Sequence, residues 1–338
     1  MKRNAIPVWF ALLISAMTVG CDVPLPVDLQ PTAATENVQA ETVSFRQNGI
    51  PAKSPGNLLV ATFNIQVFGV TKAQDVWVMQ RLAAIIRTFD VVAIQEIRST
   101  DDSVLQQLVN YVNAEGQQYS YVISERLGRT HSKEQYAYVF DTSRVVSNQN
   151  ATYTVGDGNS ARQNSNAAGS TDLLHREPYV ARFISTDTQN PFRFSLINIH
   201  TDPDLAENEV NVLADVYQNV RAFELSTANE DDVLLMGDFN AAPNKFGRLA
   251  VIPGVQPVIL DQPTNTAETK LYDNIVVDKY STFEYTGRYG VLRMREVFGL
   301  EIADAKRLSD HNPVWAEFTS QERLAPTAMS EDPALLRR

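Results

Sequence analysis

The sequence predicts a layered α/β fold, and three observations support this prediction. Short apolar runs bounded by polar residues recur along the chain, which is typical of buried strands. Segments at 73–89 and 205–227 lie between such runs and are predicted helices. The pattern occupies about 260 residues, a length that suits a single mixed domain. A hydrophobic content of 44% is sufficient for a large core.

Six of the apolar runs carry a polar residue of chemical interest at or near one end. In chain order, the runs and these residues are 59–64 with Asn64, 91–96 with Glu96, 194–200 with His200, 234–240 with Asp238 and Asn240, 272–277 with Asp273, and 309–318 with Asp310 and His311. Enzymes of the α/β class gather polar groups from strand ends into one cleft. The sequence therefore predicts a single cleft to which several strands contribute.

The segment 234–240 is the most informative of these runs. Residues i and i+2 of a strand project to the same side, so Asp238 and Asn240 should project together. A carboxylate beside a carboxamide can orient a water molecule and contact a phosphate oxygen. A strand-ending Asp-Xaa-Asn is also a common turn, which remains the alternative interpretation.

Eight short segments resemble the endonuclease/exonuclease/phosphatase superfamily and, within it, the deoxyribonuclease I group. In family order they are Thr62-Phe63-Asn64-Ile65, Ile94-Gln95-Glu96-Ile97-Arg98, Leu127-Gly128-Arg129, Lys133-Glu134-Gln135-Tyr136, Arg176-Glu177-Pro178, Gly237-Asp238-Phe239-Asn240, Tyr272-Asp273-Asn274-Ile275-Val276-Val277 and Ser309-Asp310-His311. The resemblance implies a four-layer sandwich over residues 56–319, with two packed, mainly antiparallel sheets flanked by helices.

The resemblance also implies a catalytic apparatus built on two histidines, each oriented by a carboxylate. The implied catalytic residues are His200 with Glu134, His311 with Asp273, and Asp238 and Asn240. Histidine suits proton transfer because its pKa lies near neutrality. Which histidine is the acid and which is the base stays open. The two remaining histidines, His131 and His175, are interpreted as structural.

The resemblance gives Glu96 as a Mg²⁺ or Mn²⁺ ligand, with Asn64 as its neighbour and Asp310 completing the site. Hard divalent cations prefer such oxygen ligands. A salt bridge from Glu96 to Arg98 is the alternative. Arg98 resembles an arginine that reads the minor groove, and Arg176 resembles one that contacts phosphate, a task suited to a planar guanidinium.

Two structural Ca²⁺ sites are also expected from the resemblance. The first comprises Asp157, Asp172 and Glu177, and the second comprises Asp261, Thr264 and Thr266. Three carboxylates brought together without a cation would repel one another. For the first site, a solvated acidic loop is the alternative.

The chain departs from the family pattern at positions that would contact a DNA duplex. Ser132 replaces a groove-reading tyrosine, Gln66 replaces an arginine, and the disulfide cysteines of the family are absent. The net charge of −11 also excludes a generic basic nucleic-acid-binding protein. These departures leave the form of the substrate open.

The N-terminus has the pattern of a targeting signal. Lys2 and Arg3 precede the apolar stretch 5–19, and small residues lead to Cys21, the single cysteine of the chain. We expect a signal peptide at 1–20, a lipidated, disordered tether at 21–55 and a flexible tail at 320–338. An ordinary secretory signal is the alternative, so the expected location is extracytoplasmic, either membrane-anchored at the periplasm or cell surface, or secreted.

The sequence thus predicts a divalent-cation-dependent phosphodiesterase, a deoxyribonuclease I-like endonuclease that cuts DNA with little sequence preference. The expected partners are duplex DNA and, through the lipid anchor alone, a membrane; the expected state is a monomer. The alternatives are a phospholipid or sugar-phosphate phosphodiesterase on the same fold, and a non-catalytic surface binding module.

Overall fold

The computed structural model describes residues 45–46, 49–129, 133–156 and 173–323. Two β-sheets form the centre of this part of the chain. The first sheet has the strand order β12-β13-β1-β2-β4-β3. Its strands are β1 (Asn57–Phe68), β2 (Val91–Ile97), β3 (Tyr119–Ile123), β4 (Gln135–Asp141), β12 (Tyr285–Val291) and β13 (Val314–Thr319).

The second sheet has the order β10-β11-β9-β8-β7-β5, and β6 also pairs with β7. Its strands are β5 (Val145–Val146), β6 (Thr152–Thr154), β7 (Tyr179–Ser185), β8 (Arg193–His200), β9 (Val233–Asp238), β10 (Val255–Pro257) and β11 (Asp273–Asp278). Each sheet has one parallel pair among its described strands, β1 with β2 and β8 with β9. The remaining pairs are antiparallel, which confirms the predicted sheet type.

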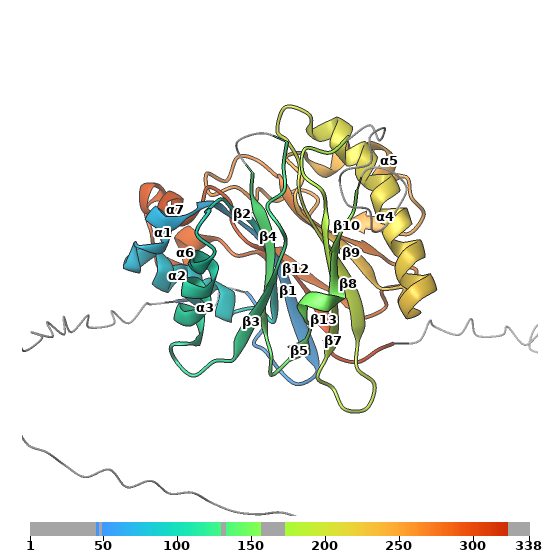
Figure 1. The fold of residues 1–338 in the computed structure, drawn as a ribbon, viewed down its shortest axis with the longest axis horizontal. Helices are drawn as coiled ribbons and strands as arrows, with labels where there is room; N and C mark the ends of the chain where they lie inside the picture. The colour runs from blue at the N-terminus through green and yellow to red at the C-terminus, as the bar shows by residue number, and fades with distance from the viewer. Residues whose placement is uncertain (1–44, 47–48, 130–132, 157–172, 324–338) are drawn as a thin grey trace, which may run out of the picture. The chain divides into compact units, whose positions relative to one another are not determined.

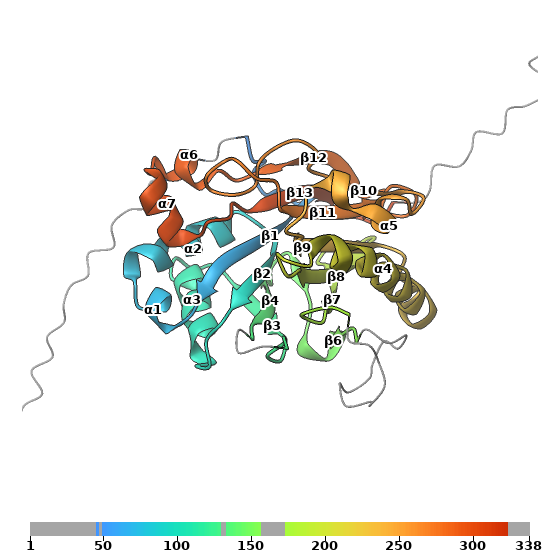
Figure 2. The same cartoon turned by 90° about the horizontal axis from the view of Figure 1, so that it is seen from above.

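Helices cover the outer face of each sheet (Figures 1 and 2). One group packs on the first sheet: α1 (Val70–Ala73), α2 (Val76–Arg87), α3 (Ser103–Asn113), α6 (Met294–Phe298) and α7 (Ile302–Leu308). The other packs on the second sheet: α4 (Ala206–Ala228) and α5 (Gly247–Ala250). Two short 3-10 turns, η1 (Gln149–Ala151) and η2 (Pro243–Lys245), complete the described elements. The four-layer sandwich is confirmed, and the predicted helices correspond to α1–α2 and α4.

Strand β1 shows how the sequence pattern produces these layers. Leu59 and Phe63 pack beneath the helices, whereas Leu58 and Val60 pack between the two sheets. Alternate side chains of a strand point to opposite faces, so one strand supplies two hydrophobic layers. The central layer also includes stacked aromatic rings, such as Phe192 with Phe194 at a centroid distance of 4.7 Å.

A buried polar network joins the two sheets directly below the end of β2. Nε2 of Gln95 donates to Oγ1 of Thr62 at 2.9 Å and to Oδ1 of Asn198 at 2.6 Å. Nδ2 of Asn198 in turn donates to the carbonyl of Ile94 at 3.1 Å. Because these groups have no access to water, their pairing fixes how one sheet sits on the other.

The packed structure extends slightly beyond the strand-based limits 56–319. The ring of Phe45 contacts that of Phe298 at 5.4 Å, and Ile50 is buried. After β13, the hydroxyl of Ser320 donates to the carbonyl of Pro55.

Within the described ranges, no helix combines the length and apolarity needed to cross a bilayer. The predicted signal peptide and most of the predicted tether and tail lie outside these ranges.

Candidate active site

The parallel strand pairs bring the polar strand ends together at one edge of the sandwich. Asn64 pairs in register with Gln95, the residue before Glu96, across β1 and β2. His200 pairs with Asp238 across β8 and β9, and Asp238 also pairs with Asp273 across β9 and β11. The predicted convergence of these strand ends is therefore present in the structure.

His200 is held by a buried carboxylate at the start of β4. Its Nδ1 lies 2.8 Å from Oε1 of Glu134, which has no exposed surface. Nε of Arg176 lies 3.3 Å from the other oxygen of Glu134, and its Nη1 donates to the carbonyl of His200. Burial would lower the pKa of His200, but the Glu134 carboxylate outweighs it and raises that pKa. Glu134 therefore fixes both the orientation and the basicity of the ring.

His311 is held in the same way from β11. Its Nδ1 lies 2.9 Å from Oδ2 of Asp273, and that oxygen also accepts a hydrogen bond from Oγ1 of Thr264. Burial would lower the pKa of His311, but the carboxylates of Asp273 and Asp238 hold it well above its ordinary value. The structure thus forms both histidine–carboxylate pairs that the family resemblance implies.

Asp238 lies between the two histidines. Its Oδ2 is 3.6 Å from Nε2 of His200 and 3.5 Å from Nε2 of His311, and it accepts a hydrogen bond from Nδ2 of Asn64. Burial would raise the pKa of Asp238, but the two histidines hold it below its ordinary value. The site therefore presents two imidazole nitrogens to one ionised carboxylate.

Backbone strain is concentrated at this site. Six non-glycine residues in the described ranges have positive φ, and four belong to the site: Gln66, Val67, Glu96 and Asn240. A β-branched residue such as Val67 rarely adopts this conformation. The amide of Val67 donates to Oε2 of Glu96 at 2.8 Å, so the strained backbone near the end of β1 positions the Glu96 carboxylate.

The residues predicted to hold the divalent cation form an oxygen-rich group. Oε1 of Glu96 accepts from Nδ2 of Asn64 at 3.2 Å, and Nε of Arg98 lies 3.2 Å from Oε2. The alternative salt bridge between Glu96 and Arg98 is thus also present. Oδ1 of Asp310 is buried without a hydrogen-bond partner and lies 3.7 Å from Nε2 of His311. Carboxylate and amide oxygens fit Mg²⁺ or Mn²⁺.

Asp238, Asp273 and His311 also lie within metal-binding distance of one another. Hydrogen bonding between His311 and Asp273 and the approach of His311 to Asp238 account for this proximity. The proximity of these three residues therefore follows from their own contacts and does not require a metal ion.

Lys72 is a site residue that the sequence analysis missed. Its Nζ donates to the carbonyls of Ile65, Gln66 and Leu308 at 2.7, 2.5 and 2.9 Å. It thereby ties the end of β1 to the segment that carries Asp310 and His311. No local motif marks Lys72, because its partners are backbone carbonyls, one of which is far away in the sequence.

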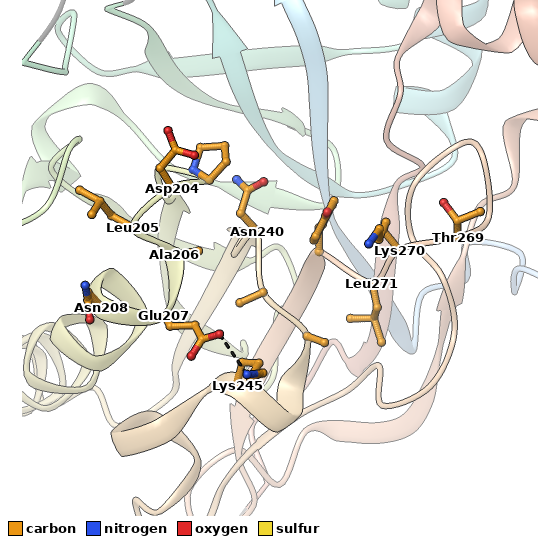
Figure 3. A pocket seen from close by; sticks show the side chains of 14 residues that line it. Asp204, Leu205, Ala206, Glu207, Asn208, Asn240, Lys245, Thr269, Lys270 and Leu271 are labelled. Carbon is orange, nitrogen blue, oxygen red and sulfur yellow. Dashed lines mark ion pairs between the residues drawn. The ribbon is translucent and has the colours of Figure 1, made fainter.

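Asn240 does not point freely into the cleft. Its Nδ2 donates to the carbonyl of Thr201 at 3.0 Å, and its amide donates to Oδ1 of Asp238 at 2.9 Å. Asn240 also lines an adjacent cavity of about 760 Å³ (Figure 3). Lys245 and Lys270 line the same cavity, and Lys245 forms an ion pair with Glu207 at 3.1 Å.

Arg176 and Arg98 both lie beside Glu134, and Arg98 also lies beside Glu96. The side chain of Arg176 is 4% exposed and that of Arg98 is 28% exposed. Arg98 therefore has the more accessible guanidinium, and Arg176 holds Glu134 from the protein side. His175 lies 3.6 Å from Asp202, which fits its structural interpretation, whereas His131 and Ser132 fall outside the described ranges.

The structure describes only some of the predicted Ca²⁺ ligands. Of the first set, only Glu177 is described; Asp157 and Asp172 lie outside the described ranges. In the second set, Oγ1 of Thr264 donates to Asp273 and accepts from two backbone amides, so this oxygen has no lone pair left for a cation. Oγ1 of Thr266 donates to the carbonyl of Ser309, and Asp261 is exposed. This geometry argues against the Thr264 hydroxyl as a ligand.

Comparison with known proteins agrees with this geometry. The chain is 32% identical over 275 residues to deoxyribonuclease-1 of Bos taurus, covering 78% of this chain and 93% of that protein. It is 30% identical over 297 residues to deoxyribonuclease gamma of Mus musculus, covering 83% and 90%. An endonuclease/exonuclease/phosphatase family protein from Bacteroides thetaiotaomicron shares the fold, with a TM-score of 0.55 at 19% identity, covering 80% of this chain and all of that one.

The model of the Endonuclease/Exonuclease/phosphatase family matches residues 61–254, which include β1, β2, β8 and β9 with their polar ends. The match, the relatives and the paired histidines agree, and the chain belongs to the endonuclease/exonuclease/phosphatase family.

Proposed function

We propose that this protein is a divalent-cation-dependent endonuclease that cuts DNA with little sequence preference. The observation that carries the proposal is the placement of two carboxylate-oriented histidines beside one ionised carboxylate. Nε2 of His200 and Nε2 of His311 lie 3.6 and 3.5 Å from the same oxygen of Asp238. A binding module would not need such a paired arrangement of proton donors and acceptors.

Hydrolysis of a phosphodiester requires two proton transfers. A water molecule must lose a proton as it attacks phosphorus, and the departing oxygen must gain one. His200 and His311 can perform these two tasks because each has its Nδ1 bound to a carboxylate and its Nε2 directed towards the cleft. Asp238 would orient the attacking water and stabilise the histidine that becomes charged.

Glu96, Asn64 and Asp310 would hold the cation beside this centre. When bound, Mg²⁺ or Mn²⁺ would neutralise negative charge that develops on the phosphate oxygens. The amide of Val67 and the guanidinium of Arg98 keep the Glu96 carboxylate in place.

DNA is the favoured substrate because the curated relatives that cover most of the chain are deoxyribonucleases. The accessible Arg98 and the two lysines of the adjacent cavity can contact phosphates on either side of the cut bond. Among the described ion pairs, none involves the side chain of Lys270, which leaves it available to a phosphate. Contacts to phosphates carry no sequence preference, and the minor groove, which the family resemblance assigns to Arg98, distinguishes base pairs only weakly.

The test is a nicking assay of the full chain on supercoiled plasmid. We expect nicking with Mg²⁺ or Mn²⁺, products that end in 5′-phosphate, and no nicking in excess EDTA. Phospholipid vesicles and a sugar-phosphate diester serve as competing substrates. Full plasmid nicking in EDTA would contradict the metal requirement, and efficient cleavage of either competing substrate without plasmid nicking would replace DNA as the substrate.

We also propose that the protein works outside the cytoplasm as a monomer, tethered through lipid on Cys21. This rests on the N-terminal pattern of the sequence, since Cys21 lies outside the described ranges. Replacing Cys21 with Ser should move the protein from the membrane to the soluble fraction. An unchanged distribution would favour ordinary secretion.

A further inference from the structure

A group of acidic side chains lies at the end of the sandwich far from the active site. Asp232 directly precedes β9, Glu284 directly precedes β12, and Glu322 follows β13. Carboxylate oxygens of these three residues all lie within 4.8 Å of one another. We call them the carboxylate cluster. Asp238 is at the other end of β9, about 20 Å away at 3.3 Å per strand residue.

The carboxylate cluster lacks the cations that normally accompany buried acids. Asp232 is 1% exposed and Glu284 is not exposed at all. Within the described ranges, no ion pair to a lysine, arginine or histidine involves any of the three cluster residues. The positive charge of Arg193 acts to lower the pKa of Glu322, but burial outweighs it and raises that pKa. Buried carboxylates without partners are strongly unfavourable.

Many of the other buried acids in the described residues lie beside a basic side chain, whereas Glu209 and Glu230 instead accept hydrogen bonds from backbone amides. Asp278 meets Arg221, and Glu317 meets Arg288 and also accepts a hydrogen bond from Asn57. The carboxylate cluster differs from these acids because three carboxylates come together and two of their buried oxygens have no hydrogen-bond partner.

Unpartnered oxygens surround the cluster. Oδ1 of Asp232 and Oε2 of Glu284 are buried without a hydrogen-bond partner, and so is the hydroxyl of Thr282. Thr282 is 3% exposed, and its hydroxyl is directed at Asp232, where it acts to lower the pKa of that carboxyl. A buried hydroxyl and two buried carboxylate oxygens without hydrogen-bond partners, gathered at one point, are suited to bind a cation.

The remaining atoms of the cluster are held firmly. The other oxygen of Glu284 accepts from the amide of Arg323, and Oε2 of Glu322 accepts from the amide of Arg193 at 3.2 Å. The carbonyl of Asp232 accepts from the amide of Ser195 at 2.8 Å. The backbone thus fixes the positions of the carboxylates while leaving oxygens free.

We propose that Asp232, Glu284 and Glu322, with the Thr282 hydroxyl, bind one structural Ca²⁺ ion. All the donors are oxygen atoms, which select a hard cation. Opposite ligands of Ca²⁺ lie about 4.6–5.2 Å apart, given Ca–O distances of 2.3–2.6 Å, so oxygens within 4.8 Å of one another fit around it. Mg²⁺ demands shorter distances and octahedral geometry and keeps much of its water, which suits this mixed set less well.

The position of the ion explains what it would do. Asp232 belongs to the second sheet, whereas Glu284 and Glu322 flank strands of the first sheet. One ion bound to all three would join the two sheets and the segment that follows β13. Burial also raises the pKa of Glu284 to about 7 and that of Asp232 to about 10, which agrees with carboxylates placed together without a counter-ion.

The test counts Ca²⁺ ions bound to the full, metal-stripped chain by calorimetry in the presence of saturating Mg²⁺. Glu284→Gln and Asp232→Asn each preserve shape and remove one charge. Each should bind one Ca²⁺ fewer than the unmodified protein, or bind it at least about tenfold more weakly. Glu317→Gln is the matched control, since Glu317 is a buried acid with its own cation partner; it should keep the full count.

Thermal unfolding provides the second readout. Ca²⁺ should raise the melting temperature of the unmodified protein more than that of either cluster variant. Without Ca²⁺ the variants should melt at or above the temperature of the unmodified protein, because each replaces a buried carboxyl beside two others with an amide that cannot ionise. Equal Ca²⁺ counts in all proteins would overturn the proposal. So would a Ca²⁺ response that the variants retain in full, since a proton shared among the carboxyls would then stabilise the cluster.

Discussion

His200 and His311 face the same oxygen atom, Oδ2 of Asp238, at 3.6 and 3.5 Å. His200 reaches it from the end of β8 and His311 from the segment between α7 and β13, and different carboxylates, Glu134 and Asp273, hold the two rings. Neither carboxylate is exposed to more than a trace of solvent. The two rings thus form one unit around Asp238.

The first prediction concerns this unit. His200→Ala and His311→Ala should each reduce plasmid nicking by about 10²–10⁴-fold, because each removes one proton transfer. The double variant should lose less than the product of the two losses, since both rings serve one reaction sequence. The measurement is initial nicking rate, with circular dichroism to verify folding. His175→Ala is the control and should keep near-normal activity. Normal turnover in either single variant would remove that histidine from the mechanism.

The second prediction concerns Gly237, which precedes Asp238. Its φ is +145°, and an added Cβ would lie 1.9 Å from the carbonyl oxygen of Ile199 on the neighbouring strand. Gly237→Ala should therefore separate β8 from β9 and destabilise the fold by roughly 3 kcal/mol or more. Urea unfolding measures this loss.

Gly287→Ala is the matched control for Gly237→Ala. Gly287 also has a positive φ, of +82°, but no atom lies within 4 Å of an added Cβ. It should cost only about 1–2 kcal/mol, the penalty of the left-handed conformation. Equal losses in the two variants would show that conformation rather than collision dominates at Gly237.

The third prediction concerns Lys72 and pH. Burial lowers the pKa of Lys72 to about 8 from its ordinary value of 10.5. A group with a lowered folded-state pKa contributes stability that is fully present above the unfolded-state pKa and is lost as pH falls through the folded-state pKa. The contribution of Lys72 to the unfolding free energy should therefore increase as the pH rises from 8 to 10.5.

Lys72→Arg should remove this contribution, because a guanidinium does not titrate in that range. Denaturant unfolding of both proteins at several pH values gives the difference. The stability of the unmodified protein relative to Lys72→Arg should increase from pH 8 to pH 10.5. Parallel curves would contradict the burial of a titrating Lys72 amine.

The fourth prediction concerns the loop between about Val155 and Glu177. If Asp157, Asp172 and Glu177 bind Ca²⁺, the ion should slow proteolysis of this loop and raise the melting temperature. A ligand at a hundredfold excess over its dissociation constant stabilises the folded state by about 2.7 kcal/mol. Asp172→Ala should lose both effects. Mapping the cleavage sites by mass spectrometry distinguishes Ca²⁺ bound at this loop from Ca²⁺ bound at the carboxylate cluster. Glu284→Gln should leave the protection of the loop unchanged. Identical loop cleavage with and without Ca²⁺ would refute the site.

The sequence by itself determined the fold class and most positions of the site. Strand-length apolar runs ending in Asn64, Glu96, His200 and Asp238 define which residues reach the cleft, because a strand delivers its last side chain to the sheet edge. Family resemblance, rather than spacing, supplied the pairing of His200 with Glu134 and of His311 with Asp273. These partners are 66 and 38 residues apart, so no local pattern could have paired them.

Only the tertiary structure decided how the parts meet. The register of β8 on β9 places His200 beside Asp238, and the sandwich then brings His311 to the same oxygen. Lys72 acts on backbone carbonyls, which leave no trace in the sequence.

The carboxylate cluster likewise became visible only in three dimensions. Asp232, Glu284 and Glu322 belong to distant segments and look like ordinary surface acids in the sequence. The packing of two sheets brings them together and buries Asp232 and Glu284. Packing sets distance and solvent access, and these two quantities decide whether a charged side chain is a solvated group, an ion-pair partner or a ligand.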